Sequence, residues 1–330
     1  METKLSSIQK SSTLNNEPTL SASEFDKKLL KFVKDFCSPF EDMRKCLADV
    51  RIAATVEKET KGQDLPLWPL DTCYVTQQCV IDLYNNASVG AKLAGDPSLL
   101  NDESLLLDML IEPTILGGCF AWDKVRNIVH VNNKQLDNSL LDCSCASLAK
   151  LPQWAICFNT IENNIFLDDR PVAGVIFYRN FNHKHPLELL GFTPSENNAL
   201  DGETAAPFNL LNSILIFHDG KIVLGPHLAL SNSCSVKISL ENNGKDIKDF
   251  AEVMELSKVL TNEDIIHMGN SYAKEAYSIF TLLAYLLKNL DKLKNEKGEK
   301  VSFAPNPEPI KTKQGYRLFG SDRISSYYID

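Results

Sequence analysis

Residues Leu148–Thr160 read LAKLPQWAICFNT, an apolar run that is broken at Pro152 and followed by Trp154 and a strand-like stretch. Two longer stretches of the same kind come after it: RPVAGVIFYRNF, from Arg170, and LLNSILIFHDGKIVLG, from Leu210. Clusters of β-branched and aromatic residues separated by turn residues are typical of strands in a sheet. The start at Pro152 and Trp154 is a structural motif in this reading, and we expect Trp154 to be buried.

The third stretch contains the pair Asp219-Gly220 between two apolar runs. This pair tolerates the positive φ angles that a two-residue hairpin turn demands. We therefore expect residues 151–240 to form a mostly antiparallel sheet with a hairpin turn at Asp219-Gly220.

Helices are expected on both sides of this stretch in the sequence. The run SPFE places a capping hydroxyl at Ser38, a proline at the first helical position and Glu41 at the third. An apolar stripe with steps of three and four residues follows, formed by Phe40, Met43, Leu47, Val50 and Ala54. Two more helical patterns extend to about residue 111, so residues 23–112 are expected to be a helical region.

After Gly117 and Gly118 the composition becomes strand-like, beginning with CFAWDKVRNIVHV. Two apolar helices, at 245–260 and 271–294, are expected to pack on the sheet. The fold class is thus α+β, with a core over residues 113–294.

Both ends of the chain are expected to lie outside this core. Residues 1–22 are rich in Ser, Thr, Asn and Lys, and such a composition is typical of a disordered tail. In residues 295–330, Pro305, Pro307 and Pro309 each remove an amide donor, which predicts an extended, proline-rich basic tail. The alternative for this tail is a solvated terminus or a strand added back to the body.

Composition excludes several classes of protein. The formal net charge of -9 argues against bulk attraction to nucleic acid or to anionic membranes. Nine cysteines at scattered spacings do not form a disulfide framework and fit a reducing compartment. The first residues lack the apolar run of a signal peptide, and the most apolar segment, residues 276–287, is too short to span a bilayer. We expect an acidic cytoplasmic protein without membrane contact.

Possible metal ligands have a simpler interpretation in each case. Cys143 and Cys145 are two apart, whereas structural zinc sites usually use Cys-x2-Cys and a second pair of ligands. Glu308 and Lys311 resemble half of a nuclease core but are flanked by prolines instead of lying on a buried strand. We expect neither a metal nor a cofactor.

Possible catalytic residues are equally open to a structural interpretation. His183 and His185 are two apart and could act as a general base, but a polar loop after a strand also accounts for them. Asp168 and Asp169 beside Arg170 could act in acid-base catalysis, but a turn accounts for them too. No nucleophile elbow, dinucleotide-binding turn or Walker loop occurs. We expect no enzyme, with a hydrolase built on these residues as the alternative.

The order of five segments is more specific than any one of them. LPQWAICFNT is followed by PVAGVIFYRNF, SILIFHDGKIVLGPHLAL, SVKISLENNGKDIKDFAEVM and the apolar SYAKEAYSIFTLLAYLLKNLDKL, and then by PEPIKTKQGYRLFGSDRISSYY. This order, over roughly residues 145–328, resembles the type V anti-CRISPR family that suppresses production of a Cas12-type nuclease. In that family a basic segment rich in His and Trp follows the last motif, whereas this sequence ends at Asp330.

The resemblance implies a non-enzymatic regulator from a mobile genetic element, such as a phage or plasmid. It implies a protein partner, either the nascent nuclease chain or the translation machinery. Tyr316, Arg317 and Arg323 in the basic tail are the predicted partner-binding residues, because arginine pairs well with carboxylate or phosphate and tyrosine adds rigid contact area. The alternative, from a different class of function, is a host-interacting effector or docking protein unrelated to CRISPR.

Overall fold

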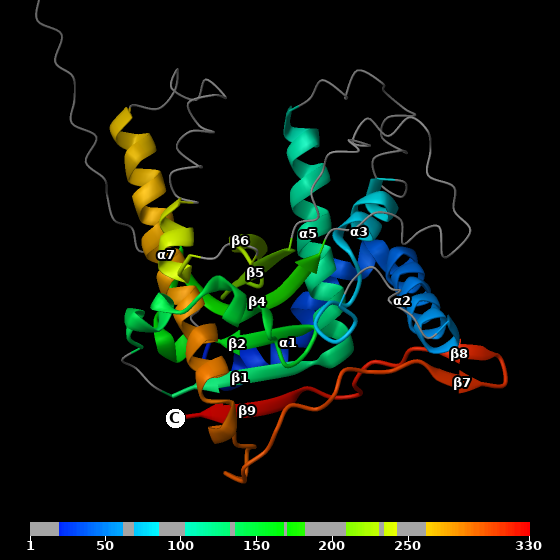
Figure 1. Ribbon diagram of the computed structural model, residues 1–330. Coiled ribbons are helices and arrows are strands. Elements are labelled where there is room, and N and C mark those ends of the chain that lie inside the picture. The colour runs from blue at the N-terminus through cyan, green and yellow to red at the C-terminus, as the bar shows by residue number, and fades with distance from the viewer. Residues whose placement is uncertain are drawn as a thin grey trace, which may run out of the picture.

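A computed structural model describes residues 20–61, 69–85, 103–132, 136–167, 170–181, 209–230, 234–242 and 262–330; for 61, 103–110 and 262–274 only the backbone is described. In these ranges a mixed sheet lies between two helical layers (Figure 1). The N-terminal helices cover one face, and the long helix α7 (Asn262–Lys288) covers the other. This arrangement confirms the α+β class with a helical N-terminal part.

The N-terminal layer contains α1 (Ala22–Cys37), α2 (Glu41–Lys61), α3 (Gln77–Tyr84) and α5 (Glu103–Val125). The predicted apolar stripe is confirmed, since Met43, Leu47, Val50 and Ala54 are all buried. A 3-10 turn, η1 (Ser38–Phe40), joins α1 to α2.

The predicted role of Ser38 as the N-terminal cap of a helix is wrong. The Ser38 hydroxyl donates to the Asp35 carbonyl at 2.9 Å, so it caps the end of α1 instead of the start of α2. The capping box lies earlier, where the Ser21 hydroxyl accepts from the Glu24 amide and the Glu24 carboxylate accepts from the Ser21 amide. These contacts satisfy amides that the first turn of α1 leaves free.

The main sheet consists of β1 (Asn127–Val131), β2 (Ala155–Asn159), β3 (Phe166–Leu167), β4 (Arg170–Phe181), β5 (Asn209–Phe217), β6 (Ile222–Ala229) and β9 (Ser325–Ile329). Its strand order is β6-β5-β4-β2-β1-β9, with β3 beside β4. Strand β1 runs parallel to both β2 and β9, and the other pairs are antiparallel. The mostly antiparallel sheet is therefore confirmed.

Both faces of the central strands are buried, which explains their almost continuous apolar composition. In β2, Ala155 and Cys157 belong to the core under the N-terminal helices, while Ile156 and Phe158 belong to the core under α7. Phe280 of α7 packs on Phe177 of β4 with ring centroids 5.4 Å apart.

Helix α7 and the short η9 (Leu290–Lys292) account for the helix expected at 271–294, with an earlier start. The helix expected at 245–260 lies outside the described residues.

The segment after Gly117 and Gly118 is not the start of the sheet, contrary to expectation. Helix α5 continues to Val125, and the first strand begins at Asn127. A Cβ on Gly118 would lie 2.5 Å from Cδ1 of Tyr178 and still closer to Ile214. The glycine pair thus permits close packing of α5 on the sheet, and it does not mark a turn.

The hairpin between β5 and β6 forms where it was predicted, but its turn is longer. The Phe217 amide donates to the Lys221 carbonyl at 3.0 Å, and the Gly220 amide donates to the Phe217 carbonyl at 2.9 Å. Only Gly220 has a positive φ angle, of 86°. A three-residue turn with one left-handed glycine replaces the expected two-residue turn.

Two further features of the fold concern the cysteines and the helices. All nine cysteines are free thiols, and six of them are buried. Within the described ranges, no helix combines the length and the apolar character that crossing a membrane requires.

The two adjacent glycines of α5 generate a matched test of the helix-sheet contact. Gly118→Ala should lower the free energy of unfolding by about 1 to 3 kcal/mol, because the added methyl overlaps Tyr178 and Ile214. Gly117→Ala should be neutral or stabilising by up to about 1 kcal/mol, because its Cβ would meet Val80 at an ordinary 3.6 Å. Chemical denaturation measures both, and equal effects would contradict this account of Gly118.

Candidate functional site

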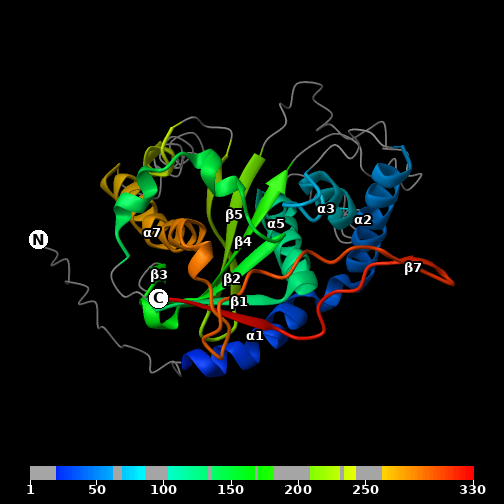
Figure 2. The ribbon, with the colours of Figure 1, turned by 60° about the horizontal axis from the view of Figure 1, so that its bottom comes forward.

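The C-terminal arm, defined here as residues 304–323, leaves the body, forms a hairpin and returns. Strands β7 (Ile310–Thr312) and β8 (Gly315–Arg317) pair only with each other among the described strands. In both views the hairpin reaches outward beyond the body (Figures 1 and 2). The arm is therefore a projecting element held at its two ends.

The first attachment of the arm is the stretch that opens β2. The Gln153 side-chain amide donates to the Ala304 carbonyl at 2.8 Å, and the Trp154 backbone amide donates to Oδ1 of Asn306 at 2.9 Å. Asn306 in turn donates to the Asp71 carbonyl at 2.6 Å. The Leu-Pro-Gln-Trp stretch thus positions the arm as well as the strand.

The second attachment is the end of α5. Leu318 is buried, and Ser321 donates through its amide to the Lys124 carbonyl at 2.8 Å and through its hydroxyl to the Val125 carbonyl at 3.1 Å. The Arg126 guanidinium reaches the Asp322 carbonyl at 3.5 Å. Three hydrogen-bonding groups of the body therefore fix the returning chain only a few residues after the hairpin.

The tail expected to run extended ends as a strand. Residues Ser325–Ile329 form β9, which pairs in parallel with all of β1. The prolines lie in the stretch 301–309, which contains no strand. A chain shortened to Glu299 would lose this strand, so it would change the fold together with the arm.

Beneath the first attachment, Trp154 is fully buried, as expected. Its indole donates to the Leu70 carbonyl at 2.9 Å, and the Arg51 guanidinium lies 4.5 Å from its ring centroid. Arg51 also donates to the carbonyls of Leu70, Cys73 and Tyr74, at 2.7, 3.0 and 3.3 Å. Burial lowers the pKa of Arg51 to about 10, so the side chain remains charged at neutral pH. The contact is a cation-π pair that holds the loop at residues 69–76.

The arm presents apolar and cationic side chains together. Ile310 is 57% exposed and Phe319 is 58% exposed, the highest values among large hydrophobic residues in the described part of the chain. Ile310 pairs across the hairpin with Arg317, so both lie on one face. Arg317 is exposed, the next residue Leu318 is buried, and Phe319 is exposed again, so exposed and buried side chains alternate from Arg317 to Phe319. We call Ile310, Arg317 and Phe319 the exposed stripe.

The predicted partner-binding residues lie on two parts of the arm. Tyr316, which is half-buried, and the exposed Arg317 are on β8, whereas the exposed Arg323 precedes β9. The attached segment Leu318–Ser321 separates them, so the arginines do not share one element.

Ile310 and Phe319 were not predicted from the sequence. The run Ile-Lys-Thr-Lys before the turn at Lys313-Gln314 could have indicated that Ile310 is exposed, whereas no such signal distinguishes Phe319 from the adjacent Leu318.

The residues of the sheet motif lie elsewhere. Asp219 and Gly220 are in the turn between β5 and β6, at the opposite edge of the sheet from β9. The Asp219 carboxylate accepts from Arg170 at 3.3 Å and from the Lys221 amide at 2.9 Å. Both contacts stabilise the turn, which gives Asp219 a structural role.

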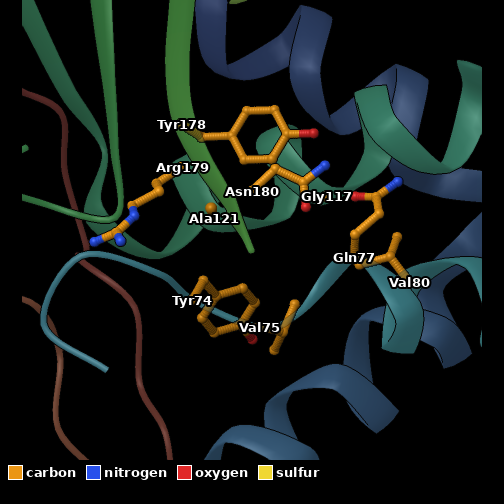
Figure 3. Close-up of a pocket in the computed structure, with 9 residues that line it drawn as sticks. All are labelled: Tyr74, Val75, Gln77, Val80, Gly117, Ala121, Tyr178, Arg179 and Asn180. Atoms are coloured by element: carbon orange, nitrogen blue, oxygen red, sulfur yellow. The ribbon is translucent and has the colours of Figure 1, made fainter. Parts of the chain in front are cut away.

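A small hollow lies between α3, α5 and β4 (Figure 3). Gln77 and Asn180 are each 4% exposed, and their amide oxygens have no hydrogen-bond partner. Figure 3 shows these two oxygens turned toward one another. The space has room for about one water molecule. A water that donates to both oxygens would satisfy them, so the hollow fits a structural water better than a substrate.

The structure does not assemble a catalytic or metal site from the other candidate residues that it describes. His183, His185, Asp168 and Asp169 lie outside the described residues. Within the described ranges, no three His, Cys, Asp or Glu side chains gather as metal ligands.

Cys145, Glu308 and Lys311 are not in the environments that metal binding or nuclease chemistry would require. Burial raises the pKa of the Cys145 thiol, which keeps it protonated at neutral pH. Glu308 and Lys311 are exposed on the arm, away from any buried strand.

The fold can now be compared with known proteins. It is an α+β fold in which a mixed sheet lies between N-terminal helices and one long C-terminal helix. Comparisons with family models and with curated proteins found no match to the sequence. Among solved structures, the fold is similar to the crystal structure of AcrVA2, with a TM-score of 0.55 and 13% sequence identity. The match covers 91% of this chain and 83% of that chain. At this identity the likeness shows a shared fold.

The position of Trp154 generates a prediction about stability. Trp154→Ala should lower the free energy of unfolding by about 3 to 5 kcal/mol, because it leaves a cavity beneath Arg51 and removes a donor to Leu70. Trp154→Phe keeps an aromatic ring beneath Arg51 and leaves a smaller cavity, so it should cost less. Thermal and chemical denaturation measure both. A Trp154→Ala protein with an unchanged thermal midpoint but lost partner binding would reverse this assignment.

Proposed function

We propose that the chain is a non-enzymatic, protein-binding regulator of the anti-CRISPR type, which lowers the level of an RNA-guided type V nuclease. The observation that carries this proposal is the fold shared with AcrVA2 over 91% of the chain. The order of segments in residues 145–328 supports it independently, because that order is a feature of sequence.

A protein partner is supported by the geometry of the arm. Exposed apolar residues beside arginine on a projecting element are typical of protein interfaces. The net charge of -9 opposes binding of long nucleic acids to the body as a whole. In this proposal the arm contacts the partner, and the sheet and helices hold the arm in place.

The finer proposal concerns when the nuclease is recognised. In this proposal the protein acts while the nuclease is being synthesised, so the partner would be the nascent nuclease chain or the translation machinery. This places the protein in the cytoplasm and gives it a use to a mobile element that must survive a CRISPR system.

The test is expression of the chain together with a tagged type V nuclease under an inducible promoter. Nuclease protein should fall, whereas an unrelated RNA-guided nuclease from the same promoter should not. Purified nuclease that is already folded should keep its activity when the chain is added. Capture of the chain on stalled nascent nuclease, compared with a stalled unrelated protein, identifies the partner. Unchanged nuclease levels, with no capture, would contradict the proposal.

The predicted partner-binding arginines provide a test within the chain. Arg317→Ala with Arg323→Ala should weaken nuclease suppression or partner capture at least tenfold, equivalent to about 1.4 kcal/mol. The melting temperature should remain nearly unchanged, because both side chains are exposed. The control is Lys27→Ala with Lys28→Ala, which removes the same charge from an exposed face of α1. Full activity in the arginine variant would place the functional surface elsewhere.

A further inference from the structure

We infer that the exposed stripe, Ile310, Arg317 and Phe319, binds an acidic segment of a protein in which a carboxylate is flanked by apolar side chains. The inference rests on the proposed function and specifies the chemistry of its partner. It depends on three properties of the arm: its fixed geometry, the availability of Arg317, and the charge of the arm relative to the body.

The arm presents the stripe in a fixed geometry. Asn306 and Ser321, on either side of the hairpin, are hydrogen-bonded to the body at 2.6 to 3.1 Å. The hairpin itself is closed by the pairing of Ile310 with Arg317 and of Thr312 with Gly315. A segment held in this way loses little conformational freedom when it binds, so more of the contact energy contributes to affinity.

Arg317 is available for a carboxylate. The one hydrogen bond of its guanidinium within the described residues is to the side-chain oxygen of Gln314, at a long 3.5 Å. Arginine presents five N–H donors in a planar fork that matches the two oxygens of a carboxylate. Ile310 is the cross-strand partner of Arg317, and the exposed Phe319 follows Arg317 two residues later in the chain. Apolar neighbours that exclude water strengthen a pair between arginine and a carboxylate.

The charge of the arm distinguishes a protein segment from nucleic acid. Residues 308–317 contain three cations, Lys311, Lys313 and Arg317, and one carboxylate, Glu308, whereas the whole chain has a net charge of -9. A short acidic segment meets mainly the local cations. A long polyanion also meets the acidic body, which repels it.

The experiment is selection from a library of displayed random peptides on the full-length chain. Peptides selected by the native chain should be enriched in Asp or Glu flanked by apolar residues. For the best peptide, Arg317→Ala should raise the Kd at least tenfold, and Arg317→Lys should have an intermediate effect because it keeps charge without the planar fork. Ile310→Ser with Phe319→Ser should also weaken binding, and Lys27→Ala with Lys28→Ala should not. Melting temperatures exclude misfolding as the cause.

Three outcomes would overturn the inference: no acidic enrichment, enrichment that the stripe variants leave unchanged, or tighter binding of a single-stranded RNA oligonucleotide than of the best peptide. The result is separable from the proposed function. If the stripe variants lower the nuclease level as much as the native chain does, the stripe is not the partner site, although the proposed function holds. If stripe-dependent acidic peptides are selected but nuclease levels never fall, the function fails and the binding chemistry stands.

Discussion

The guanidinium of Arg51 lies 4.5 Å from the ring centroid of Trp154, and both side chains donate to the carbonyl of Leu70. A buried cation without a carboxylate is costly, and here the carbonyls of a loop and an aromatic face replace water. That loop, at residues 69–76, also accepts from the arm at Asp71 and from Arg179 of β4 at Thr72. One buried pair therefore connects the helical layer, the sheet and the arm. Loss of this pair would therefore weaken contacts in the helical layer, the sheet and the arm.

The sheet could be predicted because its determinants are local. Alternating side chains of β2, β4 and β5 enter two different cores, so each strand is apolar on both faces and bounded by turn residues. The end of α5 could not be predicted in the same way. CFAWDKV has a strand-like composition, and its helical state depends on Gly118 meeting Tyr178 and Ile214 far along the chain. For the β5–β6 hairpin, the sequence located the turn at Asp219-Gly220 but not its three-residue length.

The candidate site on the arm was predictable only in part, because some of its determinants are local and others are long-range contacts. Basic residues and prolines are visible in the sequence, and they indicated the region of Tyr316 and Arg317. Which apolar residues of the arm stay exposed depends on attachments between residues about 150 positions apart, such as Gln153 with Ala304. Leu318 and Phe319 are adjacent and similar in hydrophobicity, yet only the tertiary structure determines that one is buried and the other exposed.

The parallel pairing of β9 with β1 has a consequence for the order of folding. Strand β1 is made early, but its outer neighbour is later in the chain than every other described strand. During translation the sheet can therefore assemble from β1 to β6 while one edge of β1 still has unpaired backbone groups. The arm, which lies between α7 and β9, acquires its second attachment only in the same late step. If the arm binds the partner as proposed, a newly made molecule would become competent to bind only after its body has formed.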